Sequence, residues 1–209
     1  MIPKTIVQFW NNKKLPDDIA QLQSTWLHHN PSFAVEVYDS EQANSLILKE
    51  FGQDVLDLYR VAALPAMQSD IFRLAYCLAK GGIYVDMATR CKNKIDELLA
   101  EPDSLTVMRK WHGGIWNGFI ACAAGNPVLT QIWKNVLDNL KSRRFDDVWK
   151  ATGPYNFNQV IDSETYKNHV CVIPQTKINP YFDLVNDLEH KKQAHWSEMQ
   201  KQTSIYLSI

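Results

Sequence analysis

Apolar residues are spaced along the chain in two ways, and the two kinds of spacing alternate. Short runs of β-branched and aromatic residues predict strands at 5–10, 34–38, 83–85, 105–108, 119–123 and 170–174. Apolar residues that recur every three or four positions predict helices at 17–28, 42–51, 53–60, 65–80, 95–99, 127–141 and 157–161. Strands that alternate with helices predict an α/β fold with a mostly parallel sheet.

The helix at 65–80 and the strand after it organise the sequence. Pro65 suits a first helical turn, where its missing N–H costs nothing. Gly81-Gly82 ends the helix because glycine adopts the positive φ that a C-cap needs. The strand that follows delivers Asp86 at its carboxyl end. Ligands of open α/β sheets bind beyond the carboxyl ends of strands, so Asp86 is placed where a ligand is expected.

Asp70 and Arg73 lie three residues apart in this helix and therefore on one side of it. One interpretation is a structural ion pair, either buried or exposed. The other is that both groups face a polar ligand near Asp86. Arg73 would then hold a phosphate or orient Asp70, and Asp70 would accept protons from sugar hydroxyls. Spacing alone leaves both interpretations open.

Two motifs lie close together in this part of the chain: Ser69-Asp70-x-x-Arg73 and Gly81-Gly82-x-Tyr84-x-Asp86. Together they resemble the sugar-nucleotide-binding region of family 32 glycosyltransferases, which include bacterial capsule and lipopolysaccharide transferases. The resemblance extends over roughly 2–183. It implies a GT-A fold and an enzyme that transfers a hexose or N-acetylhexosamine, with retention, from a nucleotide sugar (a UDP-sugar is favoured) to a saccharide or lipid-linked saccharide acceptor.

The resemblance also implies roles for particular residues. It places four residues in catalysis: Asp70, Arg73, Asp86 and Asn117. It places five residues on the nucleotide sugar: Gln8, Trp10, Ser69, Gly82 and Tyr84. Arg90 joins them as the nearest cation after the strand end. Gln8 and Trp10 are expected at the base, where stacking on an aromatic ring contributes about 1–3 kcal/mol. Asn117 is expected near the donor sugar and the attacking hydroxyl. His112 has two interpretations, an acceptor-side group or an exposed loop histidine.

The chain departs from the family at its metal-binding motif. The family has Asp-x-Asp at the strand end, whereas this chain has Asp86-Met87-Ala88. Two carboxylates help to complete the oxygen shell of Mn2+ or Mg2+. Three interpretations stay open here. Asp86 holds a metal with help from water, phosphate and a C-terminal residue such as His195; or Arg90 stabilises the leaving diphosphate without metal; or Ala88 marks an inactive relative or an engineered substitution.

Composition narrows the class of protein. The chain has 209 residues, a net charge of −1 and 45% hydrophobic residues, which fits one globular domain over 1–209. A balanced charge makes nucleic acid an unexpected partner.

The four cysteines are widely spaced, so neither zinc nor disulfides are expected, and Cys77 and Cys122 are predicted in the core. The start has no signal-peptide layout, so we expect a cytoplasmic bacterial protein, and peripheral contact at the inner face of the membrane stays open.

The sequence thus favours a retaining transferase of bacterial surface polysaccharide synthesis. Two alternatives come from other classes of function. One is a catalytically inactive pseudoenzyme that binds a nucleotide sugar, because Ala88 stands where the second acid is expected. The other is an effector transferase that glycosylates a host protein. The sequence identifies neither the donor nor the acceptor.

Overall fold

The computed structural model describes residues 1–99, 104–189 and 196–207 as an α/β fold with a six-stranded sheet, which confirms the predicted fold class. The eight strands described are β1 (Thr5–Phe9), β2 (Ala34–Tyr38), β3 (Gly82–Val85), β4 (Thr89–Cys91), β5 (Leu105–Arg109), β6 (Ile115–Cys122), β7 (Val170–Pro174) and β8 (Phe182–Leu184). The described helices are α1 (Asp17–His29), α2 (Ser40–Phe51), α3 (Gln53–Arg60), α4 (Pro65–Lys80), α5 (Pro127–Ser142), α6 (Val148–Ala151), α7 (Pro154–Ile161), α8 (Gln175–Ile178) and α10 (Trp196–Gln202).

The central sheet has the strand order β2-β1-β3-β6-β5-β7. Strand β1 is parallel to β2 and β3, and β5 is parallel to β7. Strand β6 is antiparallel to both of its neighbours, β3 and β5. It follows that β1, β3, β5 and β7 all run in the same direction. Their carboxyl ends therefore lie along one edge of the sheet, where ligands of α/β proteins bind.

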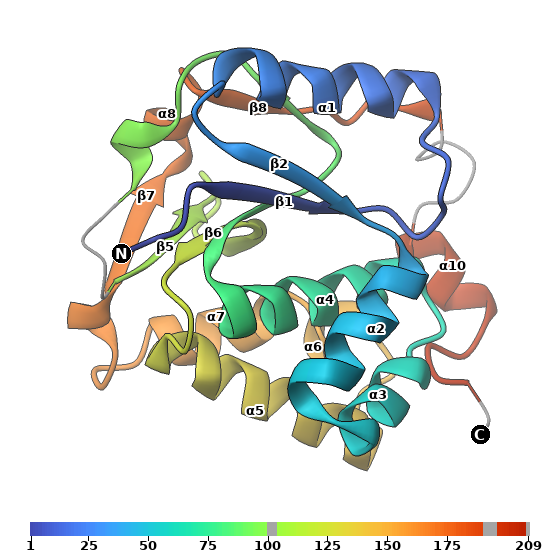
Figure 1. The fold of residues 1–209 in the computed structure, drawn as a ribbon. Coiled ribbons are helices and arrows are strands. Elements are labelled where there is room, and N and C mark those ends of the chain that lie inside the picture. Colours follow the sequence, from blue (N-terminus) through green and yellow to red (C-terminus); the bar gives the residue numbers. More distant parts are fainter. Residues whose placement is uncertain (100–103, 190–195, 208–209) are drawn as a thin grey trace.

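Different elements cover the two faces of the sheet (Figure 1). Helix α1 and the small β4–β8 pair lie on one face, and the helices from α2 to α7 lie on the other. Buried apolar residues form a core on each side. One core contains Phe72, Val107 and Phe157, and the other contains Trp26, Phe119 and Phe182. Cys77 and Cys122 are buried in the first core, as predicted.

The two glycines after α4 are required for different structural reasons. Gly81 ends the helix with a φ of 70°, as the sequence predicted. Gly82 has a φ of 106° and lies so close to β1 that an added Cβ would meet the Thr5 carbonyl oxygen at 2.9 Å. Only glycine allows both the positive φ and this close backbone approach. These two residues turn the chain directly from α4 into β3, which carries Asp86 to the sheet edge.

Several local predictions need correction. Residues 115–118 belong to strand β6 and not to a loop, because they pair with the end of β5. Leu27, an apolar residue of the predicted helix at 17–28, is 46% exposed on α1. The sequence did not predict β4, β8, α6 or α8. These elements are three or four residues long, too short for a periodic pattern to show.

The described helices include none that is both long and apolar enough to cross a bilayer.

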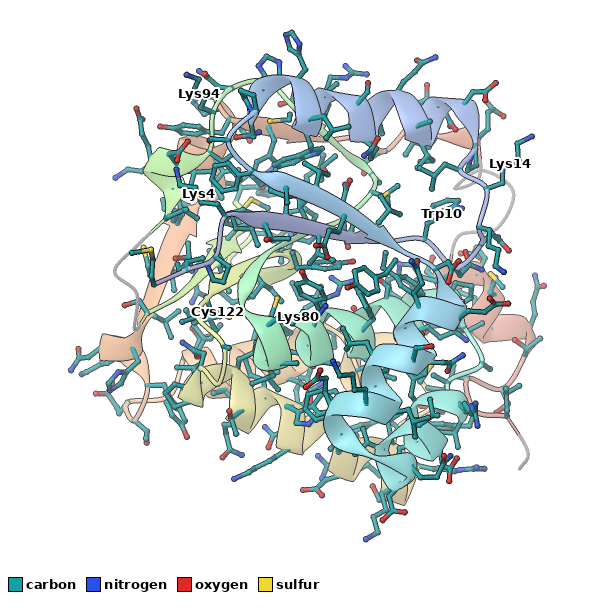
Figure 2. All side chains as sticks on the ribbon, viewed as in Figure 1. Lys4, Trp10, Lys14, Lys80, Lys94 and Cys122 are labelled. Atoms are coloured by element: carbon teal, nitrogen blue, oxygen red, sulfur yellow. The ribbon has the colours of Figure 1, made fainter. Side chains whose placement is uncertain are left out.

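Trp10 follows the end of β1, at the end of the strand opposite Lys4 (Figure 2). Its backbone N–H donates to the Tyr38 carbonyl at 2.9 Å, so the first turn after β1 stays beside β2. Trp10 and Asp86 therefore both lie at the carboxyl edge of the sheet.

Candidate active site

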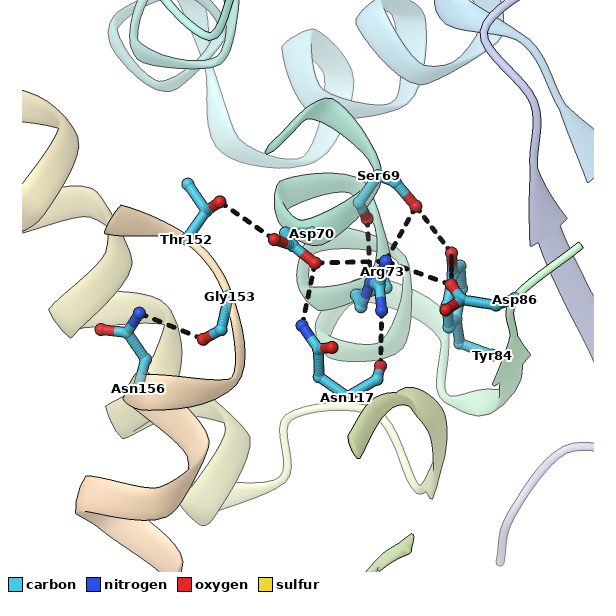
Figure 3. A network of polar contacts seen from close by, with 9 residues as sticks. All are labelled: Ser69, Asp70, Arg73, Tyr84, Asp86, Asn117, Thr152, Gly153 and Asn156. Atoms are coloured by element: carbon cyan, nitrogen blue, oxygen red, sulfur yellow. Dashed lines mark hydrogen bonds and ion pairs between the residues drawn. The ribbon is translucent and has the colours of Figure 1, made fainter. Parts of the chain in front are cut away.

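Helix α4 carries Asp70 and Arg73 into the interior of the protein. The helix is largely buried, and both of these charged residues are buried with it. A buried charge is costly unless it is paired and hydrogen-bonded. Both conditions are met here, by partners from β3, β6 and the turn between α6 and α7 (Figure 3). The sequence-based alternative of an exposed ion pair is therefore wrong.

Arg73 joins the two acidic residues. Its Nη2 lies 3.2 Å from Oδ1 of Asp70 and 3.2 Å from Oδ1 of Asp86. Its other N–H groups donate to the carbonyl oxygens of Ser69, at 3.1 Å, and Asn117, at 2.7 Å. The guanidinium also lies over the Tyr84 ring, 4.6 Å from its centroid. Arg73 is thus held in one orientation, with its donors directed at protein groups.

Asp86 reaches the same cluster from the end of β3. Its Oδ1 accepts the Tyr84 hydroxyl at 2.9 Å, and that hydroxyl lies 2.8 Å from the Ser69 hydroxyl. The Asp86 backbone N–H donates to Gly118 on β6 at 2.9 Å. The Asp86 side chain is 29% exposed, compared with 8% for Asp70 and 5% for Arg73. Among these three charged groups, Asp86 is the one most open to a ligand.

Asp70 receives hydrogen bonds from two elements besides α4. The Asn117 amide on β6 donates to its Oδ1 at 2.8 Å, and the Thr152 hydroxyl donates to its Oδ2 at 3.0 Å. Thr152 is held by a turn that Asn156 stabilises through the Gly153 carbonyl, at 3.3 Å (Figure 3). Asn117 is therefore fixed beside Asp70 in a strand, and Thr152 is a contact that the sequence analysis did not assign.

The pKa values follow from burial and charge. Burial raises the pKa of Asp70 to about 6, with Asp86 adding to the rise, while Arg73 and the hydrogen bonds from Thr152 and Asn117 oppose it. Burial lowers the pKa of Arg73, but the nearby Asp86, Tyr84 and Asp70 more than compensate, so the net shift is upward. At neutral pH the cluster of Asp70, Arg73 and Asp86 contains two carboxylates and one guanidinium. Its net charge is therefore negative.

The side chains of Asp86 and Trp116 lie very close to the backbone at Gly118. A methyl group at Gly118 would collide with Oδ2 of Asp86 and with the Trp116 indole. Both side chains therefore lie against this strand, and the absence of a Cβ makes room for them. Trp116 belongs to neither of the sequence motifs and was given no role from them. An aromatic residue two positions before a strand glycine was the signal that could have identified it.

The described residues do not fit a metal ion of the Asp-x-Asp type. They contain no group of three or more His, Cys, Asp or Glu side chains arranged to hold one. Oδ1 of Asp86 is already committed to Arg73 and Tyr84. Ala88 packs with apolar residues that include Leu188 and Val185. His195, the other predicted metal ligand, lies outside the described residues. We therefore derive no chemical step through a metal.

The predicted base-binding residues differ in accessibility. Gln8 is fully buried in β1, and neither polar atom of its amide has a hydrogen-bond partner in the part of the chain that the structure describes. Trp10 is partly exposed and packs with the apolar cluster that includes Met87 and Leu188. The Tyr84 hydroxyl donates to Asp86 and lies beside the Ser69 hydroxyl, while the Tyr84 ring is buried. The structure thus brings Ser69 and Tyr84 to Asp86 as supports.

Two other predicted nucleotide-sugar contacts, Gly82 and Arg90, lie on β3 and β4. Gly82 lies at the amino end of β3, packed against Thr5, whereas Asp86 follows the other end of the strand. Contact of Gly82 with the donor stays a prediction, and the contact that the structure shows is close packing against β1. Arg90 is exposed on β4, opposite Asp183 of β8. Its neighbours Thr89 and Cys91 are buried toward α1, so Arg90 faces the other side of this strand.

This arrangement can bind hydroxyl groups and stabilise positive charge. Carboxylates accept hydrogen bonds from hydroxyls, and a network with net negative charge favours a cationic group close to it. The oxygens of Asp86 are partly exposed, and those of Asp70 lie behind Arg73 and Asn117. Because each side chain is held by two or more partners, the charges are oriented before a ligand arrives.

Part of the chain matches a protein family. Residues 16–105 match the family described as "Glycosyltransferase sugar-binding region containing DXD motif". The matched range contains Asp70, Arg73 and Asp86. The match agrees with the expected glycosyltransferase sugar-binding region over this range. The narrower assignments, to family 32 and to capsule or lipopolysaccharide synthesis, stay predictions.

Proteins named as glycosyltransferases are similar to this chain over most of its length. An uncharacterised glycosyltransferase of Acanthamoeba polyphaga mimivirus is 24% identical over 99% of this chain and 88% of its own length. The initiation-specific alpha-1,6-mannosyltransferase of Schizosaccharomyces pombe is 28% identical over 73% of this chain, which spans only 46% of that protein. Among solved structures, the PaToxG glycosyltransferase superposes with a TM-score of 0.60 at 22% identity, over 80% of this chain and 70% of that one.

Proposed function

We propose that this protein transfers a hexose or N-acetylhexosamine from a nucleotide sugar to a saccharide hydroxyl, with retention of anomeric configuration. The observation that carries the proposal is the position of Arg73, whose single Nη2 lies 3.2 Å from a carboxylate oxygen of both Asp70 and Asp86. This contact holds two carboxylates in one site at the carboxyl edge of the sheet. The matched sugar-binding region and the glycosyltransferase relatives support the proposal.

In this proposal, Asp86 binds donor hydroxyls because its side chain is the most exposed of the charged cluster. Asp70 accepts a hydroxyl of the transferred sugar with the lone pairs that Asn117, Thr152 and Arg73 leave free. The net negative charge of the cluster stabilises the positive charge that develops on the sugar as its bond to the diphosphate breaks. Arg73 is a positioning residue, since its donors are directed at protein groups.

The leaving diphosphate needs positive charge from elsewhere. Arg90 is the cation closest to Asp86 in the sequence after the strand end, and its exposed guanidinium suits phosphate oxygens. Arg90 is our candidate for this role if turnover proves independent of metal. The choice of a UDP-sugar, the lipid-linked acceptor and a place in bacterial surface polysaccharide synthesis stay predictions from the sequence. The name of the fungal relative adds mannose to the hexoses to be tested.

The test is hydrolysis and transfer with a panel of UDP- and GDP-sugars, each with Mn2+ or with EDTA. We expect Asp70→Asn to lose at least about 100-fold in turnover, because charge stabilisation in a transition state is commonly worth about 3 kcal/mol. Its melting temperature should stay near that of the unchanged protein. Asparagine keeps the shape, and its amide can donate to the Thr152 hydroxyl. Asp57→Asn is the matched control, because Asp57 is exposed on α3.

Each outcome of this panel decides something. Turnover that survives EDTA would support the role of Arg90, and Arg90→Gln should then lower turnover. Turnover that requires Mn2+ would show that Asp86 binds metal with ligands beyond the described donor set. Binding of a nucleotide sugar without turnover, even with acceptor oligosaccharides added, would favour the pseudoenzyme. Full activity of Asp70→Asn would reject the assignment of Asp70, and an inverted product, identified by NMR, would reject retention.

A further inference from the structure

The loop between β5 and β6 presents an indole ring to solvent. Trp111 is 84% exposed, which makes it by far the most exposed large aromatic residue in the described parts of the chain. It borders a groove of about 420 Å3 whose other apolar walls are Val172 and Pro174. Gln175 and Thr176 supply polar groups beside them. Ligand sites commonly combine an apolar floor with a few polar groups and have volumes of this order.

Hydrogen bonds fix the backbone of the loop that carries Trp111. Lys110 donates its backbone N–H to Gly114 at 2.8 Å, and Gly113 donates back to Lys110 at 2.9 Å. Arg109 donates to the Gly113 carbonyl at 2.7 Å and also pairs with Asp162 at the end of α7. The Trp111 backbone N–H donates to the Gln175 side chain at 3.3 Å, which connects the loop to α8.

The groove lies on the same edge of the sheet as Asp86. The loop follows the carboxyl end of β5, Gln175 follows the carboxyl end of β7, and Asp86 follows the carboxyl end of β3. Strand β6 alone separates β5 from β3, so two strand spacings of about 4.8 Å put the loop roughly 10 Å from the strand that bears Asp86. Trp116 of β6 pairs with Met108 of β5. Its indole lies against Gly118, as the Asp86 side chain does.

We propose that the Trp111 groove is an acceptor subsite that binds a sugar ring of an oligosaccharide one or two units away from the reacting hydroxyl. This inference rests on the proposed function, which it deepens by naming the acceptor's binding surface. A pyranose has an apolar face of C–H groups, which suits a flat indole, and a rim of hydroxyls, which suits Gln175 and Thr176. The two ends of such an oligosaccharide can occupy the groove and the edge near Asp86 together.

The binding test follows the indole N–H signals of 15N-tryptophan-labelled protein, with the Trp111 signal assigned as the one missing from Trp111→Phe. The probes are linear oligosaccharides of mannose, glucose, galactose and N-acetylglucosamine, each at about 10 mM, where a site with a Kd of about 1 mM is nine-tenths filled. We expect at least one series to shift the Trp111 signal, with longer oligosaccharides binding more tightly than the monosaccharide. No shift with any series would overturn the proposal.

The kinetic test separates this subsite from the donor site. Trp111→Ala should raise the acceptor KM about tenfold, which corresponds to about 1.4 kcal/mol, and should leave hydrolysis of the donor without acceptor unchanged. Trp111→Phe keeps a ring and should have a smaller effect. Leu27→Ala is the control, because Leu27 is an exposed apolar residue on α1, over another part of the fold. An unchanged acceptor KM in Trp111→Ala would overturn the proposal.

The two proposals fail in different ways. Donor hydrolysis and transfer without any effect at Trp111 would reject the subsite and leave the proposed function standing. A shift of the Trp111 signal by oligosaccharides without turnover of any donor would reject the proposed function while showing that the groove binds sugar. A shift caused only by peptides, or by self-association as the protein concentration rises, would assign the groove to a protein partner and overturn the subsite.

Discussion

Gln8 shows how a single residue can connect stability to ligand binding. Its side chain is fully buried in β1, and neither its amide nitrogen nor its amide oxygen has a partner among the residues that the structure describes. A buried polar group without a partner costs about 1–3 kcal/mol. The resemblance predicts that Gln8 touches the base of the donor. A ligand that reached the amide would remove this cost, so Gln8 should matter more to the bound state than to the free one.

We expect Gln8→Met to stabilise the free protein by about 1 kcal/mol, because methionine has a similar shape and no amide to leave unpaired. Urea unfolding measures this change. Calorimetry with the donor should show weaker binding if the amide contacts the base. Gln53→Met, on the exposed start of α3, is the control. A loss of stability in Gln8→Met would show that the amide is hydrogen-bonded within the protein.

At the scale of elements, β6 joins the parts of the site. It places Asn117 beside Asp70, offers the Asn117 carbonyl to Arg73, and brings Gly118 against Asp86. The strand can do so because it is antiparallel to β3 and β5 and begins at the carboxyl edge, where those two strands end. Its first residues therefore lie in the site, and small changes there should affect both packing and chemistry.

Gly118→Ala should test this arrangement. The added methyl group would collide with the Asp86 carboxylate and the Trp116 indole, so we expect a loss of about 1–3 kcal/mol in unfolding free energy and a loss of donor turnover. Gly114→Ala is the matched control in the loop before the same strand. Its methyl group would meet only the His112 ring, at 3.3 Å. Equal stability and turnover in the two variants would contradict the close approach at Gly118.

At the scale of the whole molecule, the pH dependence of stability reports on the charged interior. Burial raises the pKa of Asp70 from 3.8 to about 6, so the folded protein binds this proton more tightly than the unfolded chain does. A carboxyl group of this kind favours folding most at low pH. Its contribution falls as pH rises from about 4 to 6, and it is constant outside that window.

We therefore expect the unfolding free energy of the unchanged protein, relative to Asp70→Asn, to fall between pH 4 and 6. The limiting slope is about 1.4 kcal/mol per pH unit. Subtracting the variant removes the contributions of the other titrating groups, and urea unfolding at a series of pH values supplies the data. A relative stability that rises with pH in this window would mean that Arg73 and the hydrogen bonds outweigh burial and depress the pKa of Asp70.

The sequence by itself determined the elements whose boundaries are set by local backbone chemistry. Pro65 and Gly81 fix the two ends of α4, Gly52 separates α2 from α3, and the run at Ala34–Tyr38 forms β2 at the predicted positions. These signals act within a few residues, because proline and glycine restrict or free the backbone wherever they stand. The order of helices and strands follows from them, and with it the placement of Asp86 at a strand end.

Only the tertiary structure decided which groups meet. Asp70 and Thr152 lie 82 positions apart, and Arg73 and Asn117 lie 44 apart, yet each pair is hydrogen-bonded. The short strands β4 and β8 form because they pair with each other, and Gly82 is required because β1 passes close to it. Such contacts depend on how the sheet and helices pack in three dimensions. Local residue patterns do not say which residues far apart in the sequence come into contact. They could therefore name Asp70, Arg73 and Asp86 but not the network that holds these residues.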